Sequence, residues 1–297
     1  MTKDKFIADY ENIDNQSGDE PGDLQLALIQ MSTREEDRDA NVNKAVSLVE
    51  RAAQGGAALI VLPEFFNTEY FYCRKDIKYF EYAEAEDGPT LSAISNAARK
   101  QRTHIVATIY ERARNDHYFD TAFIIDDHGD IVGRYRKIHP GGFRSLEKMY
   151  FRGGSDTPVF DVLGWRIGIS ICYDNLFPET ARGAVARGAE LVLAPFASAQ
   201  VPFWDELFVA RAVENAAYYA VCNKVGPELD EFVCAGRSKI VGPTGAVLAQ
   251  AGSDTDELLT AVLHKRAVKR ARQTFCLHRD RRPEAYTAIC ERADQIC

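Results

Sequence analysis

Short apolar runs alternate with amphipathic stretches along most of the chain. The run LQLALIQM at 24–31 is apolar enough for a strand buried on both faces. Similar runs predict further strands at 58–64, 104–112, 166–174, 191–198 and 218–226. Apolar residues at helical spacing predict a helix at 39–54, ended by Gly55 and Gly56, and we expect others at 91–101, 178–189 and 203–217.

Two segments carry the signal of antiparallel hairpins. TAFIID and IVGRYRKI flank the turn sequence DHGD at 127–130, and the segment 236–249 turns on Pro243–Gly245. A last strand is expected at 258–263. Strands that alternate with helices predict an α/β fold. Buried sheets need helices on their outer faces, so two stacked sheets would give a four-layer α-β-β-α sandwich; the pattern alone does not choose this over one doubly wound sheet.

The chain is predicted to form one domain. No linker rich in Pro, Gly or Ser interrupts 23–297, so this range is interpreted as one domain that ends in a C-terminal arm. Residues 1–22 are polar and are interpreted as a partly mobile leader. They contain neither the apolar core nor the cleavage pattern of a signal peptide.

Composition narrows the classes of partner. With 46% hydrophobic and 27% charged residues the chain is typical of a soluble globular protein. The net charge of −8 argues against nucleic acid or an anionic membrane as partner, and no apolar run approaches the ~20 residues of a membrane span. Seven cysteines without a CxxC pair predict free thiols in a cytoplasmic protein, with no metal site.

Reactive residues stand where three predicted strands end. They are Glu64 in VLPEFF, Lys137 in GRYRKIHP and Cys172 in GISICYD. The carboxyl ends of parallel strands are where α/β folds gather catalytic groups. A thiol needs a base to become a nucleophile, and a carboxylate whose pKa is raised by burial can serve. A nearby ammonium group can stabilise an oxyanion, so the three residues together suit acyl transfer.

Each of these residues also has an ordinary structural interpretation. A lone cysteine after an apolar strand is commonly a small core residue. Glu64 follows a proline and could cap a helix or turn, while Lys137 belongs to a basic cluster with Arg134 and Arg136 that fits a solvated edge strand. The spacing alone does not show that the three side chains meet.

The three segments together resemble the signatures of the nitrilase superfamily of carbon–nitrogen hydrolases. LPEFF, YRKIHP and ISICYDNLFPE occur in the family's order of Glu, Lys and Cys, and the resemblance covers about residues 23–285. It implies the α-β-β-α sandwich, a homodimer or larger homo-oligomer, and no cofactor. It also implies roles: Cys172 as nucleophile, Glu64 as base, Lys137 and the Tyr173 backbone N–H as oxyanion donors, and Glu147 in SLEKMYF as a second glutamate that orients Lys137 and the substrate.

Finer features of the resemblance bear on the substrate. Tyr173–Asp174 replaces the Trp–Glu of true nitrilases, which disfavours a nitrile. The segments CYDNLFPETAR and CLHRDRRPEAY resemble N-carbamoylputrescine amidases, and SLEKMYF and KVGPELDE resemble both these and N-carbamoyl amino acid hydrolases. The latter hold a carboxylate with two arginines, where this chain has Asn175 and Leu176.

Candidate substrate-binding residues lie in APFAS and QVPFWDELF. Asp205 and Glu206 could bind an ammonium group of the substrate, although acids in a first helical turn are equally explained by the helix dipole. Phe196, Phe203 and Trp204 could form a pocket wall or pack in the core.

The predicted function is a thiol-dependent amidohydrolase for small molecules. It would cleave a terminal ureido or carboxamide C–N bond through a covalent acyl- or carbamoyl-cysteine and release ammonia. An N-carbamoyl amine is the favoured substrate. The alternatives are an amidase for simple aliphatic or aromatic carboxamides, and a non-catalytic binding or scaffold member of the family.

Overall fold

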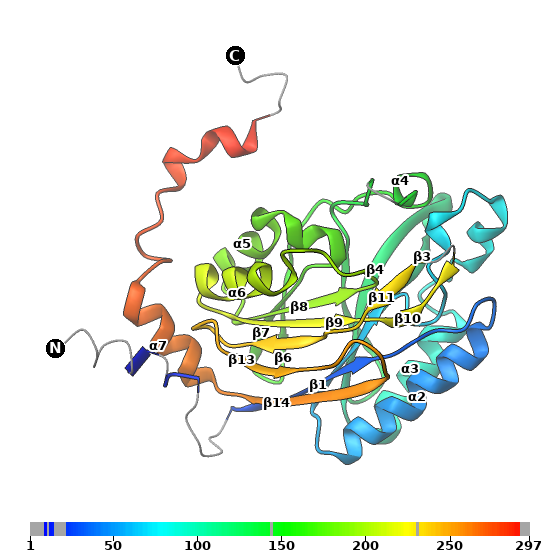
Figure 1. The fold of residues 1–297 in the computed structure, drawn as a ribbon, viewed down its shortest axis with the longest axis horizontal. Helices are drawn as coiled ribbons and strands as arrows, with labels where there is room; N and C mark the ends of the chain where they lie inside the picture. Colours follow the sequence, from blue (N-terminus) through cyan, green and yellow to red (C-terminus); the bar gives the residue numbers. More distant parts are fainter. Residues whose placement is uncertain (1–8, 11, 15–21, 143–144, 230–231, 292–297) are drawn as a thin grey trace.

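Two six-stranded sheets stacked face to face form the body of the molecule (Figure 1). The computed structural model describes residues 9–10, 12–14, 22–142, 145–229 and 232–291. The first sheet has the order β14-β1-β2-β3-β4-β5, and the second has the order β13-β12-β9-β8-β7-β6. A separate two-stranded sheet pairs β10 with β11.

Parallel and antiparallel pairing divide each sheet in the same way. In each sheet the three central strands are parallel (β1-β2-β3 and β7-β8-β9), and the flanking strands are antiparallel. The first sheet comprises β1 Leu24–Gln30, β2 Leu59–Glu64, β3 His104–Ala113, β4 His117–Ile125, β5 Ile131–Arg136 and β14 Glu257–Leu263. The second comprises β6 Val159–Val162, β7 Trp165–Ile169, β8 Leu191–Phe196, β9 Tyr218–Asn223, β12 Lys239–Val241 and β13 Val247–Gln250. The small sheet pairs β10 Val225–Pro227 with β11 Val233–Ala235.

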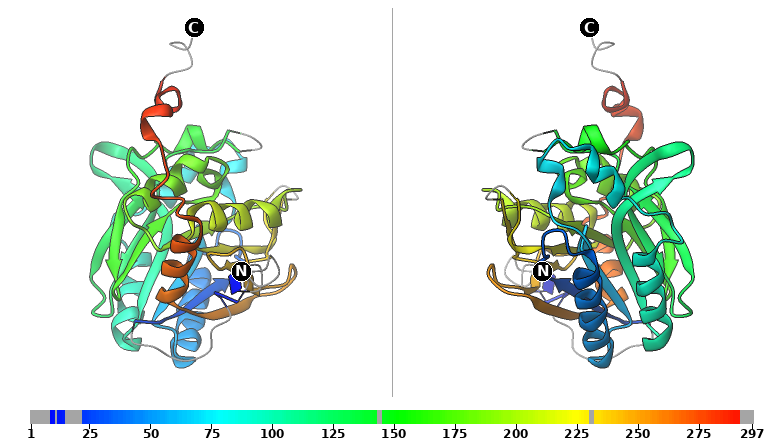
Figure 2. Two further views of the ribbon diagram at one scale, coloured as in Figure 1. Left: turned by 90° about the vertical axis from the view of Figure 1, so that its left-hand side faces the viewer. Right: turned by 90° about the vertical axis from the view of Figure 1, so that its right-hand side faces the viewer.

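Helices cover the outer face of each sheet, which confirms the α-β-β-α sandwich. Helices α2 (Arg38–Gln54) and α3 (Pro89–Gln101) pack on the first sheet, and α5 (Pro178–Ala186) and α6 (Trp204–Asn215) pack on the second. The short α4 (Glu147–Tyr150) and the basic α7 (Lys265–Phe275) complete the set, with short 3-10 turns between them. Figures 1 and 2 show these layers from three sides.

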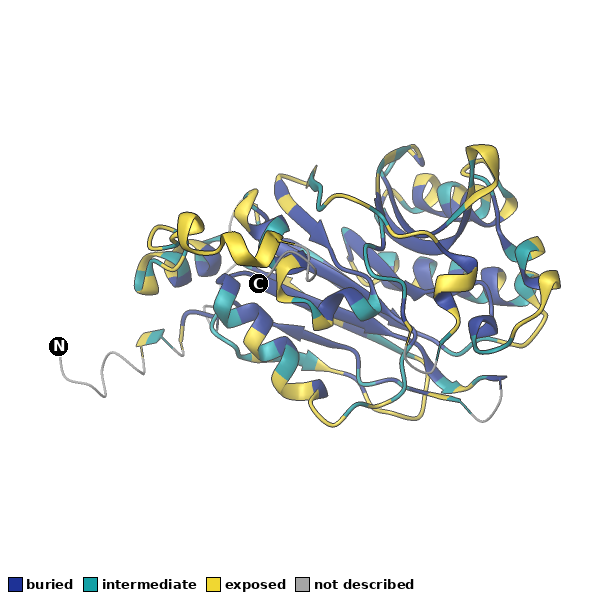
Figure 3. Ribbon diagram, turned by 90° about the horizontal axis from the view of Figure 1, so that it is seen from above, coloured by how far each residue is buried: buried dark blue, intermediate teal, exposed yellow. Residues whose placement is uncertain are grey.

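The core between the sheets follows the period-two pattern of buried strands. In β1, Leu24, Leu26 and Leu28 point between the sheets, while Ala27 and Ile29 point toward the helices. Both faces are therefore apolar, which explains the continuous apolar runs. Figure 3 shows the strands buried and the outer helix surfaces exposed.

Two predicted strands end earlier in the structure than the apolar pattern indicates. The strand predicted at 166–174 stops at Ile169, and Cys172 begins the 3-10 turn η4 (Cys172–Leu176). The strand predicted at 218–226 ends at Asn223, and the chain continues as β10 in the small hairpin. At the first place the Ile171 N–H donates a hydrogen bond to the Asp174 side chain instead of to a neighbouring strand. At the second, the side chains of Asn223 and Lys224 donate hydrogen bonds to the Ser198 and Thr68 carbonyl groups.

The described part of the predicted leader touches the body. Ile13 is buried in the core between the sheets, and Asp14 accepts hydrogen bonds from Thr244. Residues 1–8, 11 and 15–21 of the leader lie outside the described residues. After α7 the chain leaves the body, and this C-terminal segment projects away from it (Figure 2). Among the described residues, no helix is long and apolar enough to cross a membrane.

Candidate active site

Glu64 is the last residue of β2 and points to the space where the two sheets meet. Its side chain is fully buried. One carboxylate oxygen, Oε1, accepts a hydrogen bond from Lys137 Nζ at 2.8 Å, and the other, Oε2, accepts one from the Ala197 backbone N–H at 2.8 Å. Ala197 directly follows β8, which faces β2 across the core. The next residue, Phe65, has φ +49°, a left-handed conformation that bends the chain sharply after the carboxylate.

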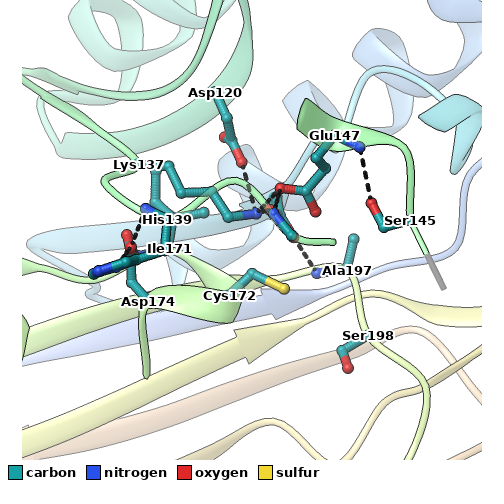
Figure 4. Close-up of polar contacts among 12 residues, drawn as sticks. Asp120, Lys137, His139, Ser145, Glu147, Ile171, Cys172, Asp174, Ala197 and Ser198 are labelled. Atoms are coloured by element: carbon teal, nitrogen blue, oxygen red, sulfur yellow. Dashed lines mark hydrogen bonds and ion pairs between the residues drawn. The ribbon is translucent and has the colours of Figure 1, made fainter. Parts of the chain in front are cut away.

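Lys137 follows β5 and is enclosed by carboxyl groups. Its ammonium nitrogen lies 2.8 Å from Glu64, 2.8 Å from Glu147 and 3.2 Å from Asp120 (Figure 4). Burial disfavours the charged form, but Glu147, Glu64 and Asp120 together raise the pKa of Lys137 well above its usual value. The lysine is therefore a permanent ammonium group, not a solvated cation on an edge strand.

Cys172 sits at a sharp turn between β7 and α5. Its φ of +43° is uncommon for a residue with a side chain and places the thiol on an elbow. Figure 4 shows Cys172 beside the cluster around Lys137, and the charges of Glu64, Lys137 and Glu147 act on its thiol. Burial, together with the Glu64 charge, raises the pKa of Cys172 well above its ordinary value, and Lys137 only partly opposes this. The resting group is consequently a neutral thiol.

Glu147 approaches Lys137 from the first residue of α4. It is buried, and its Oε2 accepts a hydrogen bond of 2.7 Å from the Gly141 backbone N–H. Burial raises the pKa of Glu147, whereas Lys137 lowers it. The structure thus brings together the four side chains that the motifs predict: Glu64, Lys137, Glu147 and Cys172.

Asp120 on β4 is a further acid in this cluster that sequence reasoning missed. It is 1% exposed and lies beside Lys137. The signal was available, because Asp120 is a lone acid in the apolar strand segment YFDTAFII. A buried acid in such a segment needs a cationic or hydrogen-bonding partner.

Asp174 joins the turn that carries Cys172 to the chain that follows Lys137. Its fully buried carboxylate accepts hydrogen bonds from the Tyr135 hydroxyl at 2.6 Å and the His139 N–H at 2.8 Å, and it lies 2.8 Å from His139 Nδ1. It also receives the Ile171 N–H at 3.3 Å. One side chain therefore fixes the backbone on both sides of the site.

Two pairs of aromatic rings include residues beside the cluster in sequence or in charge. The ring of the half-buried Tyr173, which follows Cys172, packs edge-on against Phe177, with centroids 5.3 Å apart. Tyr70, which the sequence analysis did not select, stacks on Phe232 at 4.0 Å. Burial, and after it the charge of Glu147, raise the pKa of Tyr70.

The predicted pocket residues lie mostly apart from this cluster. Phe196 and Trp204 are buried and pack edge-on against each other at 5.2 Å, in the apolar layer between α6 and the second sheet. Phe203 is exposed. Asp205 pairs with Arg237 at 2.6 Å and with Lys239, and Glu206 is exposed on α6. Asp205 already has two cations of its own chain as partners, which compensate its charge.

The sandwich and the thiol, lysine and carboxyl groups gathered at its strand ends define an amide-hydrolysing α/β enzyme. The chain belongs to the carbon–nitrogen hydrolase family, whose model matches residues 25–273. This confirms the resemblance to the nitrilase superfamily.

Relatives and solved structures agree with the family assignment. N-carbamoylputrescine amidase of Solanum lycopersicum is 33% identical over 86% of this chain and 91% of its own length. Citrullinase of Francisella tularensis is 32% identical over 90% and 98%. A Helicobacter pylori carbon–nitrogen hydrolase has a TM-score of 0.86 at 25% identity, covering 92% and 99%. An amidase from Nesterenkonia sp. AN1 has a TM-score of 0.79 at 29% identity over the same shares.

Proposed function

We propose that this enzyme cleaves a terminal N-carbamoyl or carboxamide C–N bond and releases ammonia through a covalent intermediate on Cys172. The observation that carries the proposal is the convergence of the Cys172 thiol, the Glu64 carboxylate and the Lys137 ammonium in one buried cluster. These groups supply a nucleophile, a base and an oxyanion donor, which acyl transfer requires.

The first half of the reaction forms the covalent intermediate. Because the resting thiol is neutral, Glu64 accepts its proton as the sulfur attacks the carbonyl carbon. The carbonyl oxygen becomes an oxyanion that Lys137 and the Tyr173 N–H stabilise, each donor contributing about 3 kcal/mol. The C–N bond then breaks as Glu64 returns the proton to the departing nitrogen, and ammonia leaves.

The second half regenerates the thiol. A water molecule donates a proton to Glu64 and its oxygen attacks the acyl or carbamoyl carbon. The C–S bond breaks, and Glu64 protonates the departing sulfur. Glu147 holds Lys137 in place throughout, since its other hydrogen bond, from the Gly141 N–H, fixes the carboxylate.

An N-carbamoyl amine is the substrate that we favour. Relatives named N-carbamoylputrescine amidase and citrullinase act on carbamoyl compounds by name, which supports this class. At the position where the amino acid branch carries an arginine, Asn175 is buried and donates hydrogen bonds to the Ser170 and Cys172 carbonyl groups. It therefore supports the nucleophile turn and offers no cation to a substrate carboxylate.

A simple carboxamide is the second candidate, because the Nesterenkonia amidase has the same fold. The two candidates differ in their products. A carbamoyl substrate yields ammonia, carbon dioxide and an amine, whereas a carboxamide yields ammonia and a carboxylate. We therefore propose an ammonia-release screen across carbamoyl amines, carbamoyl amino acids, carboxamides and nitriles, with carbon dioxide measured in parallel.

The nucleophile is tested by Cys172→Ala. We expect this variant to lose all turnover and to keep its melting temperature within a few degrees, since the substitution removes one sulfur from a half-buried position. Cys276→Ala, which removes a free thiol outside both the cluster and residues 277–290, is the matched control and should keep wild-type activity. Wild-type-like turnover by Cys172→Ala rules out the scheme.

We also propose that the protein forms a homodimer or larger homo-oligomer through its C-terminal segment. Residues 277–290 project from the body and expose apolar side chains, with Tyr286 41% and Ile289 60% exposed. These side chains and α5 line an apolar groove of about 750 Å³. A second copy of the chain would remove this apolar surface from water.

A further inference from the structure

Lys137 faces three carboxyl groups, one more than the sequence motifs predict. The third belongs to Asp120 on β4, and its Oδ2 lies 3.2 Å from Lys137 Nζ. Figure 4 shows Asp120 and Glu147 approaching the end of the lysine side chain from different elements. All these side chains are at most 4% exposed, so water does not screen their charges.

Hydrogen-bond donors are distributed unequally among the three acids. Glu64 accepts hydrogen bonds from Lys137 and from the Ala197 N–H, and Glu147 accepts one from the Gly141 N–H while paired with Lys137. Within the described chain, neither carboxyl oxygen of Asp120 accepts a hydrogen bond. Its one cationic contact, Lys137 at 3.2 Å, is shared with two other acids, so Asp120 is the acid whose charge the site supports least.

The balance of charge also indicates that one of the three carboxyl groups is protonated. One ammonium group cannot neutralise three carboxylates, and the cluster would hold two uncompensated negative charges if all were ionised. In addition, the Asp120 and Glu64 carboxyl groups approach the same ammonium nitrogen of Lys137, at 3.2 Å and 2.8 Å. Two carboxyl groups that share one buried cation repel each other if both are ionised, and a proton on one of them removes this repulsion. Burial raises the pKa of Asp120 well above its ordinary value, although Lys137 acts against this.

We propose that Asp120 is the protonated acid of this cluster and positions Glu64 and Lys137 by donating its O–H to the Glu64 carboxylate. This inference rests on the proposed function and adds a positioning residue to it. Asp120 keeps its proton throughout the reaction, because the proton that moves is the one exchanged between Cys172, Glu64, the leaving nitrogen and water.

A neutral Asp120 keeps the local charge favourable for the reaction. When sulfur and then the carbonyl oxygen gain negative charge, the cluster presents the Lys137 ammonium and one ionised partner, Glu147. Ionisation of Asp120 would add a negative charge next to Lys137 and weaken its attraction for the oxyanion. Loss of this proton should therefore contribute to the fall of activity at alkaline pH.

The groups that face Asp120 come from several elements. They are Glu64 at the end of β2, Lys137 after β5 and Glu147 on α4, and Cys172 of η4 belongs to the same cluster. Its strand partner on β3 is Tyr110, whose hydroxyl donates to the Tyr150 carbonyl. Since these groups remain in an Asp120→Asn variant, a change in its pH profile reports on Asp120.

The test compares Asp120→Asn with Asp120→Ala. Asparagine has the shape of the protonated acid and donates a hydrogen bond, so we expect its kcat/KM to stay within about tenfold of wild type. Its alkaline limb should move to higher pH because the titrating group is gone. Alanine leaves Glu64 and Lys137 unsupported, and we expect a loss on the order of 10²-fold, mainly in kcat. Asp161→Asn, at an exposed position, is the control and should behave as wild type.

A direct readout separates this inference from the proposed function. In the Cys172→Ala protein, infrared spectra at neutral pH should contain the C=O band of a protonated carboxyl group that shifts when aspartate is carbon-13-labelled at its carboxyl group. Addition of Asp120→Asn should remove that band. Absence of an aspartic acid band, or an Asp120→Asn variant as impaired as Asp120→Ala, overturns the inference. Full activity of Cys172→Ala overturns the proposed function instead, whatever the state of Asp120.

Discussion

At the scale of single residues, the cluster concentrates ionisable groups that the fold must keep buried. Glu64, Asp120 and Lys137 are each at most 1% exposed. Such groups lower the free energy of unfolding unless they are paired and hydrogen-bonded. The donors from Ala197 and Gly141 offset part of that cost, and both come from backbone that other elements hold in place.

Asp120 should make the stability of the protein depend on pH. A carboxyl group whose pKa is higher in the folded than in the unfolded state costs stability above its unfolded pKa. The cost grows with pH until the folded group also ionises. Asp120→Asn should therefore raise the melting temperature at neutral pH and leave it little changed near pH 3, as measured by calorimetry. An equal shift at both pH values would contradict this reasoning.

The proposed role of Glu64 as general base offers a second test at this scale. Glu64→Gln keeps the shape of the side chain but removes the proton acceptor for Cys172, so we expect kcat to fall by roughly 10²- to 10⁴-fold. Glu179→Gln, an exposed position on α5, is the matched control. A Glu64→Gln variant with normal kcat would assign the base to another group, and the pH profile of that variant would identify it.

At the scale of elements, the site depends on where strands end, and sequence patterns place strand ends poorly. The apolar run through Cys172 predicts a strand to residue 174, whereas β7 stops at Ile169 because Asp174 binds the backbone of the turn. The apolar pattern cannot register such a contact, since it depends on Tyr135 and His139 from a distant segment. The sequence also left α7 unassigned, because its buried face consists of only three small or branched residues, Ala267, Val268 and Ala271.

The link through Asp174 should matter for both stability and activity. Asp174→Ala leaves the buried Tyr135 hydroxyl and the backbone donors near His139 without an acceptor, which we expect to cost roughly 1–3 kcal/mol of unfolding free energy. Misplacement of the Cys172 turn should reduce kcat/KM by on the order of 10²-fold. Denaturant titration and kinetics measure the two effects. Asp161→Ala is the control, and a variant with normal kinetics would show that η4 holds its shape without this link.

At the scale of the whole molecule, the layered fold was the most predictable feature. Continuous apolar runs indicate burial on both faces of a strand, so helices must cover the outer faces of the sheets. The choice of two stacked sheets over one doubly wound sheet came from the resemblance to the nitrilase superfamily. The motifs predicted Glu64, Lys137, Glu147 and Cys172, which the fold brings together from four separate segments. The motifs include neither Asp120 nor the Ala197 amide. A lone acid in an apolar strand marks Asp120 as a group that needs a partner, but its contact with Lys137 and that of Ala197 with Glu64 arise only when β4 and β8 meet β5 and β2 in space.

The exposed C-terminal segment provides a test of assembly. If residues 277–290 lie against a second copy, a charge placed on their apolar side chains should weaken the dimer, because burial of an unpaired carboxylate is unfavourable. Ile289→Asp should therefore lower the molar mass measured by light scattering after size-exclusion chromatography, in a concentration-dependent way. Ile77→Asp, a charge at an even more exposed isoleucine on the 3-10 turn η2 (Ile77–Tyr82), should leave the mass unchanged. Equal masses for wild type and Ile289→Asp would show that this segment does not hold copies together, and a loss of mass in both variants would place the interface elsewhere.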